Sequence, residues 1–251
     1  MIRLKFDIGV SENCGLREHM EDRFYFDPNF RNQGELFAGV YDGHGGDAVA
    51  ELVKQELHLR FLAPLGGGVN FLDAFTFAYE IISDKACALK LWGGSCAANF
   101  ILSHDKVYFA NVGDVRILVV GPFVEQLTID HHPDNSEEKA RIKQCGGIIK
   151  RKRITSVFGS VSLSRSIGDL DYQSLGLIST PYTGTHFLIP TDLALVVATD
   201  GVFEKMTNQD VALIVRSGQD AQSISNSITQ AALKSGTRDN VTALVVKLIK
   251  T

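Results

Sequence analysis

The chain has 251 residues, of which 45% are hydrophobic and 22% charged, and its formal net charge is −4. This composition is typical of a soluble globular protein and excludes a disordered, collagen-like or coiled-coil chain. The small acidic surplus offers no basic excess for binding nucleic acid, and no apolar run is long enough to span a bilayer. We therefore expect one soluble domain over residues 1–251 that is a monomer and binds neither nucleic acid nor membrane.

The N-terminal residues 1–7 lack the long apolar stretch of a signal peptide, so we expect a cytoplasmic or nuclear protein. Cysteine thiols stay reduced in those compartments. The cysteines form no CxxC pair, which argues against a zinc site, and we expect each one to be a small buried hydrophobic residue. They are Cys14, Cys87, Cys96 and Cys145.

Strands are predicted from short runs rich in Val, Ile, Phe or Ala, and helices from apolar residues at helical spacing. The glycines at 66–68 are expected to form a loop between two helices. In chain order, the sequence predicts a strand at 36–41, helices at 47–62 and 71–89, strands at 95–102, 107–112 and 116–120, a helix at 137–144, a strand at 193–199, helices at 209–215 and 221–234, and a strand at 241–249.

Two local patterns refine this assignment. Asn135, followed by Glu138 three residues later, is expected to cap the helix at 137–144. The three strands between 95 and 120 are joined by very short links. Parallel strands need a crossover of about a dozen residues, so these strands are expected to be antiparallel. Long helices can then cover the sheet faces, and we predict an α+β fold with mainly antiparallel sheets.

Several predicted strands run directly into aspartate. Asp42, Asp114 and Asp200 each follow a strand, and Asp239 precedes the last one. Any one of them can simply end a strand, because Asp and Gly favour turns. Strand ends of one sheet can share an edge, however, and carboxylates crowded there repel one another unless a cation neutralises them. Oxygen ligands suit Mg²⁺, Mn²⁺ or Ca²⁺ better than zinc or copper, so we predict a site for a hard cation.

Eight short motifs resemble those of the metal-dependent protein phosphatases, the type-2C serine/threonine phosphatase family. No single motif is specific, but eight in the right order are. They cover nearly the whole chain, from about Gly9 to Val246. The motifs are Arg17-Glu-His-Met-Glu-Asp22, Asp42-Gly-His-Gly-Gly46, Gly94-Ser-Cys-Ala-Ala98, Ala110-Asn-Val-Gly-Asp-Val-Arg116, Leu127-Thr-Ile-Asp-His-His-Pro133, Ser164-Arg-Ser-Ile-Gly-Asp169, Ala198-Thr-Asp-Gly-Val-Phe-Glu204 and Arg238-Asp-Asn-Val-Thr242.

The resemblance implies a sandwich of two mainly antiparallel β-sheets flanked by helices on both outer faces, with residues 1–251 as a single phosphatase catalytic domain. It also implies a protein serine/threonine phosphatase that hydrolyses phosphoserine and phosphothreonine monoesters. Phosphorylated proteins would be its substrates, and two Mg²⁺ or Mn²⁺ ions, bridged by a water molecule that acts as nucleophile, would be its cofactors.

The same resemblance implies a role for each matching residue. Arg17 is expected to bind the substrate phosphate, because a guanidinium fork fits two phosphate oxygens. His44 is expected to act as the general acid that protonates the leaving oxygen. For the metal ions, the resemblance implies that Asp42 bridges both, that Glu21 and the Gly43 carbonyl bind one, that Asp200 and Asp239 bind the other, that Asp22 holds metal-bound water, and that Asp114 forms a weaker third site with Asp200.

Some positions depart from the family pattern or remain open. Cys96, Val115 and His132 replace a usual Thr, Ser and Lys, and none of these positions matches a metal ligand. The basic segment 150–153 is either a solvated strand or loop, a contact for acidic substrate segments, or a nuclear signal. The family's variable flap, which bears on substrate choice, is expected between residues 169 and 191.

Two rival functions remain. Cys145 and Arg151 fit the Cys-x5-Arg spacing of cysteine phosphatases, whose nucleophile loop needs a strand before it and a helix after it. Here the cysteine follows a predicted helix, which argues against that chemistry. The other rival is a catalytically silent pseudophosphatase that acts as a binding module. Such proteins usually lose metal-binding acids, whereas every matching acid is present here.

Overall fold

The strands at the centre of the molecule are buried on both faces. In β4 (Gly94–Ser103), alternate side chains point to opposite sides: Phe100 packs into one hydrophobic cluster and Ile101 into another. In β13 (Ala194–Ala198), Leu195 joins the cluster that contains Phe100, while Val196 joins a third. The two strands therefore face each other across one shared core, and each has a second core behind it.

The computed structural model describes residues 5–249, which form two large sheets and one small sheet. All paired strands in these sheets are antiparallel. The first sheet has the order β1 (Lys5–Asn13), β14 (Val241–Ile249), β13, β6 (Arg116–Val120) and β7 (Val124–Gln126). The second has the order β12 (Tyr182–Phe187), β5 (Lys106–Val112), β4, β3 (Leu36–His44) and β2 (Arg23–Asp27), with β11 (Ile167–Gly168) beside β4. The small sheet has the order β10 (Gly159–Val161), β9 (Arg153–Ser156) and β8 (Ile148–Lys150).

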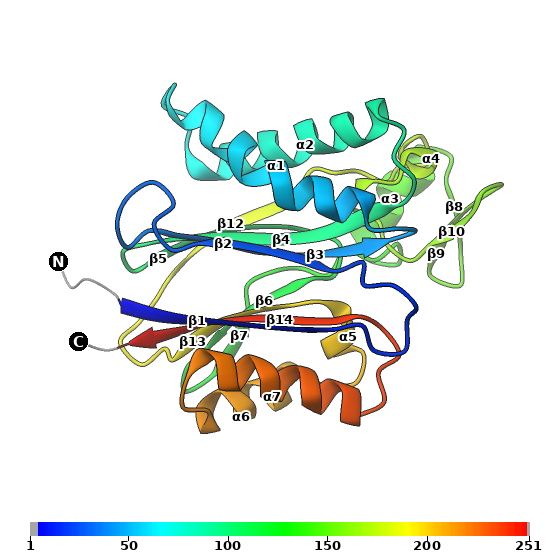
Figure 1. The fold of residues 1–251 in the computed structure, drawn as a ribbon. Coiled ribbons are helices and arrows are strands. Elements are labelled where there is room, and N and C mark those ends of the chain that lie inside the picture. Colours follow the sequence, from blue (N-terminus) through cyan, green and yellow to red (C-terminus); the bar gives the residue numbers. More distant parts are fainter. Residues whose placement is uncertain (1–4, 250–251) are drawn as a thin grey trace.

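Helices cover the outer faces of both large sheets (Figure 1). The helices α1 (Ala48–Leu65) and α2 (Phe71–Ala88) lie over the second sheet, and α6 (Asn208–Ser217) and α7 (Ala221–Lys234) lie over the first. Side chains fix where several of them begin: Asn70 accepts from two amides of α2, and Thr207 and Asp220 form capping boxes at α6 and α7. The short helices are α3 (Ser136–Gln144), α4 (Leu170–Gln173) and α5 (Asp200–Phe203).

The predicted α+β class and the two-sheet sandwich are confirmed. All eleven predicted elements are present, with ends shifted by a few residues at most, and residues 66–68 link α1 to α2. Of the N-terminal segment 1–7, residues 1–4 lie outside the described part. Within residues 5–249, no helix is both long and apolar enough to cross a membrane.

The expected run of three strands between 95 and 120 is only half correct. β4 and β5 pair antiparallel, but β6 leaves the second sheet and pairs with β13 in the first. The connection crosses at Gly113, whose φ of +80° is in the left-handed region. A side chain there would collide with Cys96, since a Cβ on Gly113 would lie 2.2 Å from its Sγ atom. A short link can therefore step from one sheet to the other as well as form a hairpin.

The predicted cap of α3 also differs in detail. Asn135 does occupy the N-cap position, but its side chain donates to the Asp130 carbonyl at 2.8 Å and caps no helix amide. Glu138 turns inward and pairs with Arg141 and Arg165. The shorter or more polar elements were not predicted, and these are β1, β2, β7 to β12, α4 and α5.

Candidate active site

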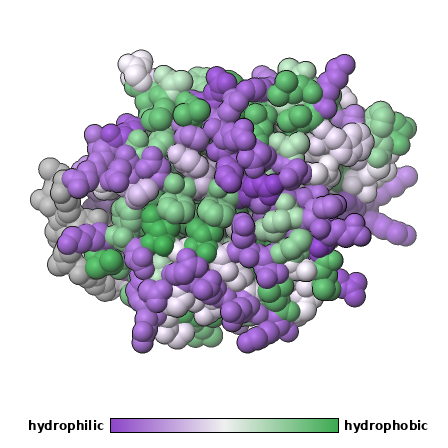
Figure 2. Space-filling view, in the orientation of Figure 1, coloured by the Kyte–Doolittle hydropathy of each residue, from purple (hydrophilic) through white to green (hydrophobic). Residues whose placement is uncertain are grey.

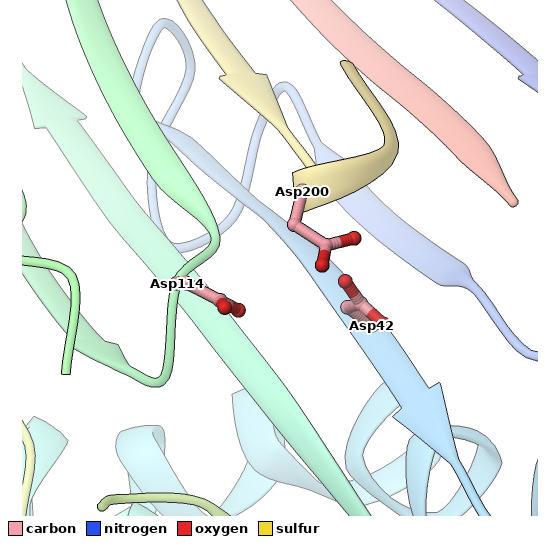
Figure 3. Close-up of side chains that lie close together, drawn as sticks. All are labelled: Asp42, Asp114 and Asp200. Carbon is pink, nitrogen blue, oxygen red and sulfur yellow. The ribbon is translucent and has the colours of Figure 1, made fainter. Parts of the chain in front are cut away.

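Three carboxylates meet where the two large sheets end. Asp42 lies in β3, Asp114 follows β5, and Asp200 is the first residue of α5, directly after β13. Within residues 5–249, each of the three offers an oxygen, and these oxygens all lie within 4.8 Å of one another. Figure 3 shows the carboxylates of Asp42 and Asp200 facing each other, with Asp114 on the adjacent loop. The strand ends therefore share an edge as expected, but they come from both sheets and not from one.

The pKa of each of these three carboxylates is raised by burial, with nearby negative charges contributing. Burial, followed by the charges of Asp200 and Asp22, raises the pKa of Asp42 well above its usual range. Burial, followed by Asp114 and Asp239, raises the pKa of Asp200 to about 7. Burial also raises the pKa of Asp114. A bound cation would favour the ionised forms, and the donor set is made of oxygens alone, so the residues present fit Mg²⁺ or Mn²⁺.

The other predicted ligands lie around this group. Glu21 and Asp239 line the same cleft, and a carboxylate oxygen of Glu21 accepts the Gly46 amide at 3.1 Å. Gly43 packs against the Glu21 backbone so tightly that a Cβ would lie 2.6 Å from the Glu21 carbonyl oxygen. Asp22 lies deeper: it is buried and accepts hydrogen bonds from the hydroxyl groups of two threonines. Its role toward a metal stays a prediction.

Arg17 reaches into the cleft from an exposed loop. Its Nη2 atom lies 2.7 Å from an Asp239 carboxylate oxygen, so the predicted phosphate ligand is paired with a predicted metal ligand. Asn240, which the sequence analysis assigned no role, fixes this loop. Its side chain accepts from the Glu21 amide at 2.7 Å and donates to the carbonyls of Cys14 and His19. The sequence did contain a signal for this role, because Asn240 directly follows the predicted ligand Asp239 in the last motif.

His44 is held by a second residue that the sequence analysis left without a role. Its Nε2 atom lies 2.7 Å from an oxygen of Asp169, which also accepts from the Ser166 hydroxyl at 2.5 Å. Asp169 is buried, and its amide donates to the Gly93 carbonyl at 2.9 Å. Burial alone would lower the pKa of His44, but the charge and hydrogen bond of Asp169 raise it. A histidine with a raised pKa is suited to donating a proton.

Apart from the deeper Asp22, the predicted site residues open into one cleft of about 810 Å³. Its walls also include Trp92, the start of α4, and the β9–β10 hairpin with Phe158. Only the beginning of the expected flap segment 169–191 therefore borders the cleft, whereas the hairpin was not anticipated. The basic segment 150–153 spans the end of β8, the turn after it and the start of β9, and its last residue, Arg153, lines the cleft.

The positions of the cysteines argue against the alternative of a cysteine phosphatase. Cys145 is exposed, so the expectation that every cysteine is buried is wrong there, and Cys14 and Cys87 are only half-buried. Cys145 ends helix α3 and is followed by a strand, and it is not among the residues that line the cleft. The helix that a cysteine-phosphatase loop requires after the nucleophile is therefore replaced by β8.

Comparisons with known proteins agree with this arrangement. Residues 6–241 match the family model described as protein phosphatase 2C. "Probable protein phosphatase 2C 2" from Arabidopsis thaliana is 34% identical over 83% of this chain, and "Probable protein phosphatase 2C 45" from Oryza sativa subsp. japonica is 30% identical over 98%. The chain spans 57% of the length of the first relative and 88% of the second. Among solved structures, a serine-threonine phosphatase 2C from Toxoplasma gondii shares the fold, with a TM-score of 0.85 over 97% of this chain and 95% of the other, at 23% identity.

Proposed function

Because the chain belongs to the protein phosphatase 2C family, we propose that it hydrolyses phosphoserine and phosphothreonine monoesters in proteins. One observation carries the proposal: three carboxylates, an arginine and a histidine bound to a buried carboxylate open into one cleft. Hydrolysis of a phosphate monoester is slow because the negative charge of the ester repels nucleophiles and its alkoxide leaves poorly. The groups in this cleft suit both obstacles. The substrate class of phosphorylated proteins belongs to the same proposal.

Two divalent cations are the proposed cofactors. Asp42, Glu21, the Gly43 carbonyl, Asp200 and Asp239 would hold them. When bound, such cations supply positive charge that acidifies water and offsets the charge of the phosphoryl group. Asp22, which lies deeper than these residues, would hold water at this centre. Asp114 would complete a weaker third site with Asp200. Oxygen donors accept both Mg²⁺ and Mn²⁺, so either ion fits.

The remaining residues handle the substrate. Arg17 would leave Asp239 and grip two phosphate oxygens with its guanidinium fork. Water would attack phosphorus, the bond from phosphorus to the serine or threonine oxygen would break, and His44 would give its proton to that oxygen. The attacking water would release one proton to solvent, and His44 would take up another from solvent. Asp169 keeps the imidazole in place and favours its protonated form. No covalent phosphoenzyme is formed in this scheme.

The test is release of phosphate from a phosphothreonine peptide, with Mn²⁺ and with excess chelator. Activity with Mn²⁺ that vanishes with chelator is the expected result, and Asp42→Asn should remove most of it while the fold persists. Chelator-resistant activity would direct attention to Cys145. A folded protein that binds phosphopeptides but releases no phosphate under any condition would be a pseudophosphatase.

A further inference from the structure

The cleft is much larger than a phosphate group requires. Its volume of about 810 Å³ falls in the range of roughly 300–1,000 Å³ that is usual for drug-sized ligands. The acidic group occupies one part of the lining. The rest comes from three separate segments, which are the loop before β4, the hairpin of β9 and β10 with the residues that follow it, and the start of α4. Each segment contributes at least one large apolar side chain, and the charged residues Lys90, Arg153 and Asp171 lie among them. The cleft therefore has a second region with a different chemistry.

Large apolar side chains in this second region are left in water. The exposed fractions are 67% for Trp92, 64% for Phe158 and 47% for Leu170. Single exposed apolar residues are common, but several around one opening mark a binding surface. Figure 2 shows hydrophobic side chains at the right-hand edge of the molecule, where Figure 1 places the small sheet. We call Trp92, Phe158 and Leu170 the apolar rim.

The apolar rim is held in place beside the chemistry. A Cβ on Gly45 would lie 3.5 Å from the Trp92 ring, so the indole lies against the turn that follows His44. Phe158 lies in the turn between β9 and β10, and its amide donates to Ser156 at 3.0 Å. Arg153 donates to the hydroxyl and the carbonyl of Ser160, at 2.9 and 2.7 Å, and so ties the two strands of this hairpin together.

We propose that the apolar rim is a subsite for an apolar side chain of the substrate, within a few residues of its phosphorylated serine or threonine. This inference rests on the proposed function. His44 must face the leaving oxygen, and that oxygen carries the peptide, so the peptide continues on the side of His44. Trp92 lies on that side. An apolar neighbour in the substrate would cover the indole and the Phe158 ring, whereas a glycine would leave both in water.

The experiment compares phosphothreonine peptides that differ at one position. In a background of Gly and Ser, a single Phe is placed in turn at each of the three positions on either side of the phosphothreonine. For at least one position, kcat/KM should exceed that of the unsubstituted peptide by about tenfold. Trp92→Ala and Phe158→Ala should each reduce this ratio toward one, mainly through a higher KM for the Phe peptide.

Phe123→Ala is the matched control. This phenylalanine is 86% exposed in the link between β6 and β7, and it is not among the residues that line the cleft. The control variant should keep the wild-type ratio. A wild-type ratio of one at every position, or a ratio that neither rim variant changes, would overturn the subsite. Failure of the Mn²⁺-loaded protein to hydrolyse any peptide would overturn the proposed function and the subsite together.

Discussion

Replacing Asp169 by asparagine should impair the enzyme selectively, toward substrates with poor leaving groups. The Asp169 carboxylate lies 2.7 Å from Nε2 of His44, and its charge and hydrogen bond raise the pKa of that histidine against the effect of burial. Asparagine keeps the shape but removes the charge. Burial then dominates, the pKa of His44 falls, and the proton that the leaving oxygen needs is absent. Because general acid catalysis contributes typically 10²–10⁴-fold, we expect kcat for a phosphothreonine peptide to fall about 100-fold.

The assay compares that peptide with p-nitrophenyl phosphate, whose leaving group is a stable anion that needs no proton. For the aryl ester we expect a loss of roughly threefold or less, because the contribution of a general acid is absent there. Thermal unfolding with and without Mn²⁺ shows whether the fold and metal binding persist. An equal loss with both substrates, or no loss with the peptide, would refute the assignment of His44 as acid and of Asp169 as its positioning residue.

Gly94→Ala provides a second way to disturb the same pair. A Cβ at this position would lie 2.4 Å from the Asp169 carboxylate and 2.8 Å from Nε2 of His44, so the two groups must move. The selective loss on the peptide should reappear. Gly66→Ala is the matched control, since a Cβ there meets no atom within 4 Å and the backbone φ is −61°.

Four further outcomes are expected. Burial raises the pKa of both Asp22 and Asp200 to about 7 in the metal-free protein. Binding of Mn²⁺ should therefore release protons, and its affinity should increase from about pH 6 to pH 8. An affinity that calorimetry finds independent of pH would contradict this. Arg17→Lys keeps the charge but loses the fork, and kcat/KM should fall about tenfold in steady-state assays, whereas a wild-type value would argue against phosphate binding by Arg17. Cys145→Ser should leave phosphate release unchanged, and a folded but inactive variant would revive cysteine chemistry. Burial lowers the pKa of His131 to about 4, so below about pH 6.5 the unfolded chain binds a proton that the folded protein does not. The free energy of unfolding should therefore fall by up to about 3 kcal/mol between pH 6.5 and pH 4. Denaturant titrations of His131→Asn should lack this component of the pH dependence.

The sequence predicted the elements whose residues are uniformly apolar or strongly periodic. The run in β4 is buried on both faces, and α7 has buried residues at helical spacing, so both could be recognised locally. β1 was missed although Phe6, Ile8 and Val10 alternate with polar residues or glycine and pack on one core, which is the pattern of a half-buried strand at the edge of a sheet. Its strand conformation depends on pairing with β14, which is more than 200 residues away.

The site was predicted in its residue types more fully than in its contacts. The acids at the strand ends were visible because Asp interrupts an apolar run. That Asp42 and Asp114 come from one sheet and Asp200 from the other depends on the crossing at Gly113, which a short link does not reveal. Asp169 lay in a recognised motif, but its bond to His44 spans 125 residues and arises only when β11 pairs with β4.

The pairing of β1 with β14 sets an order of events in biosynthesis. Lys5 pairs with Ile249 and Asn13 with Val241, so β1 waits for β14, which is made more than 200 residues later. At about 5–20 residues per second, translation of the intervening chain takes roughly 12–45 s. Asp239 is also made just before that strand. In a nascent chain, β1 therefore lacks its partner, and the acidic group lacks Asp239, until the segment that contains Asp239 and β14 has been made.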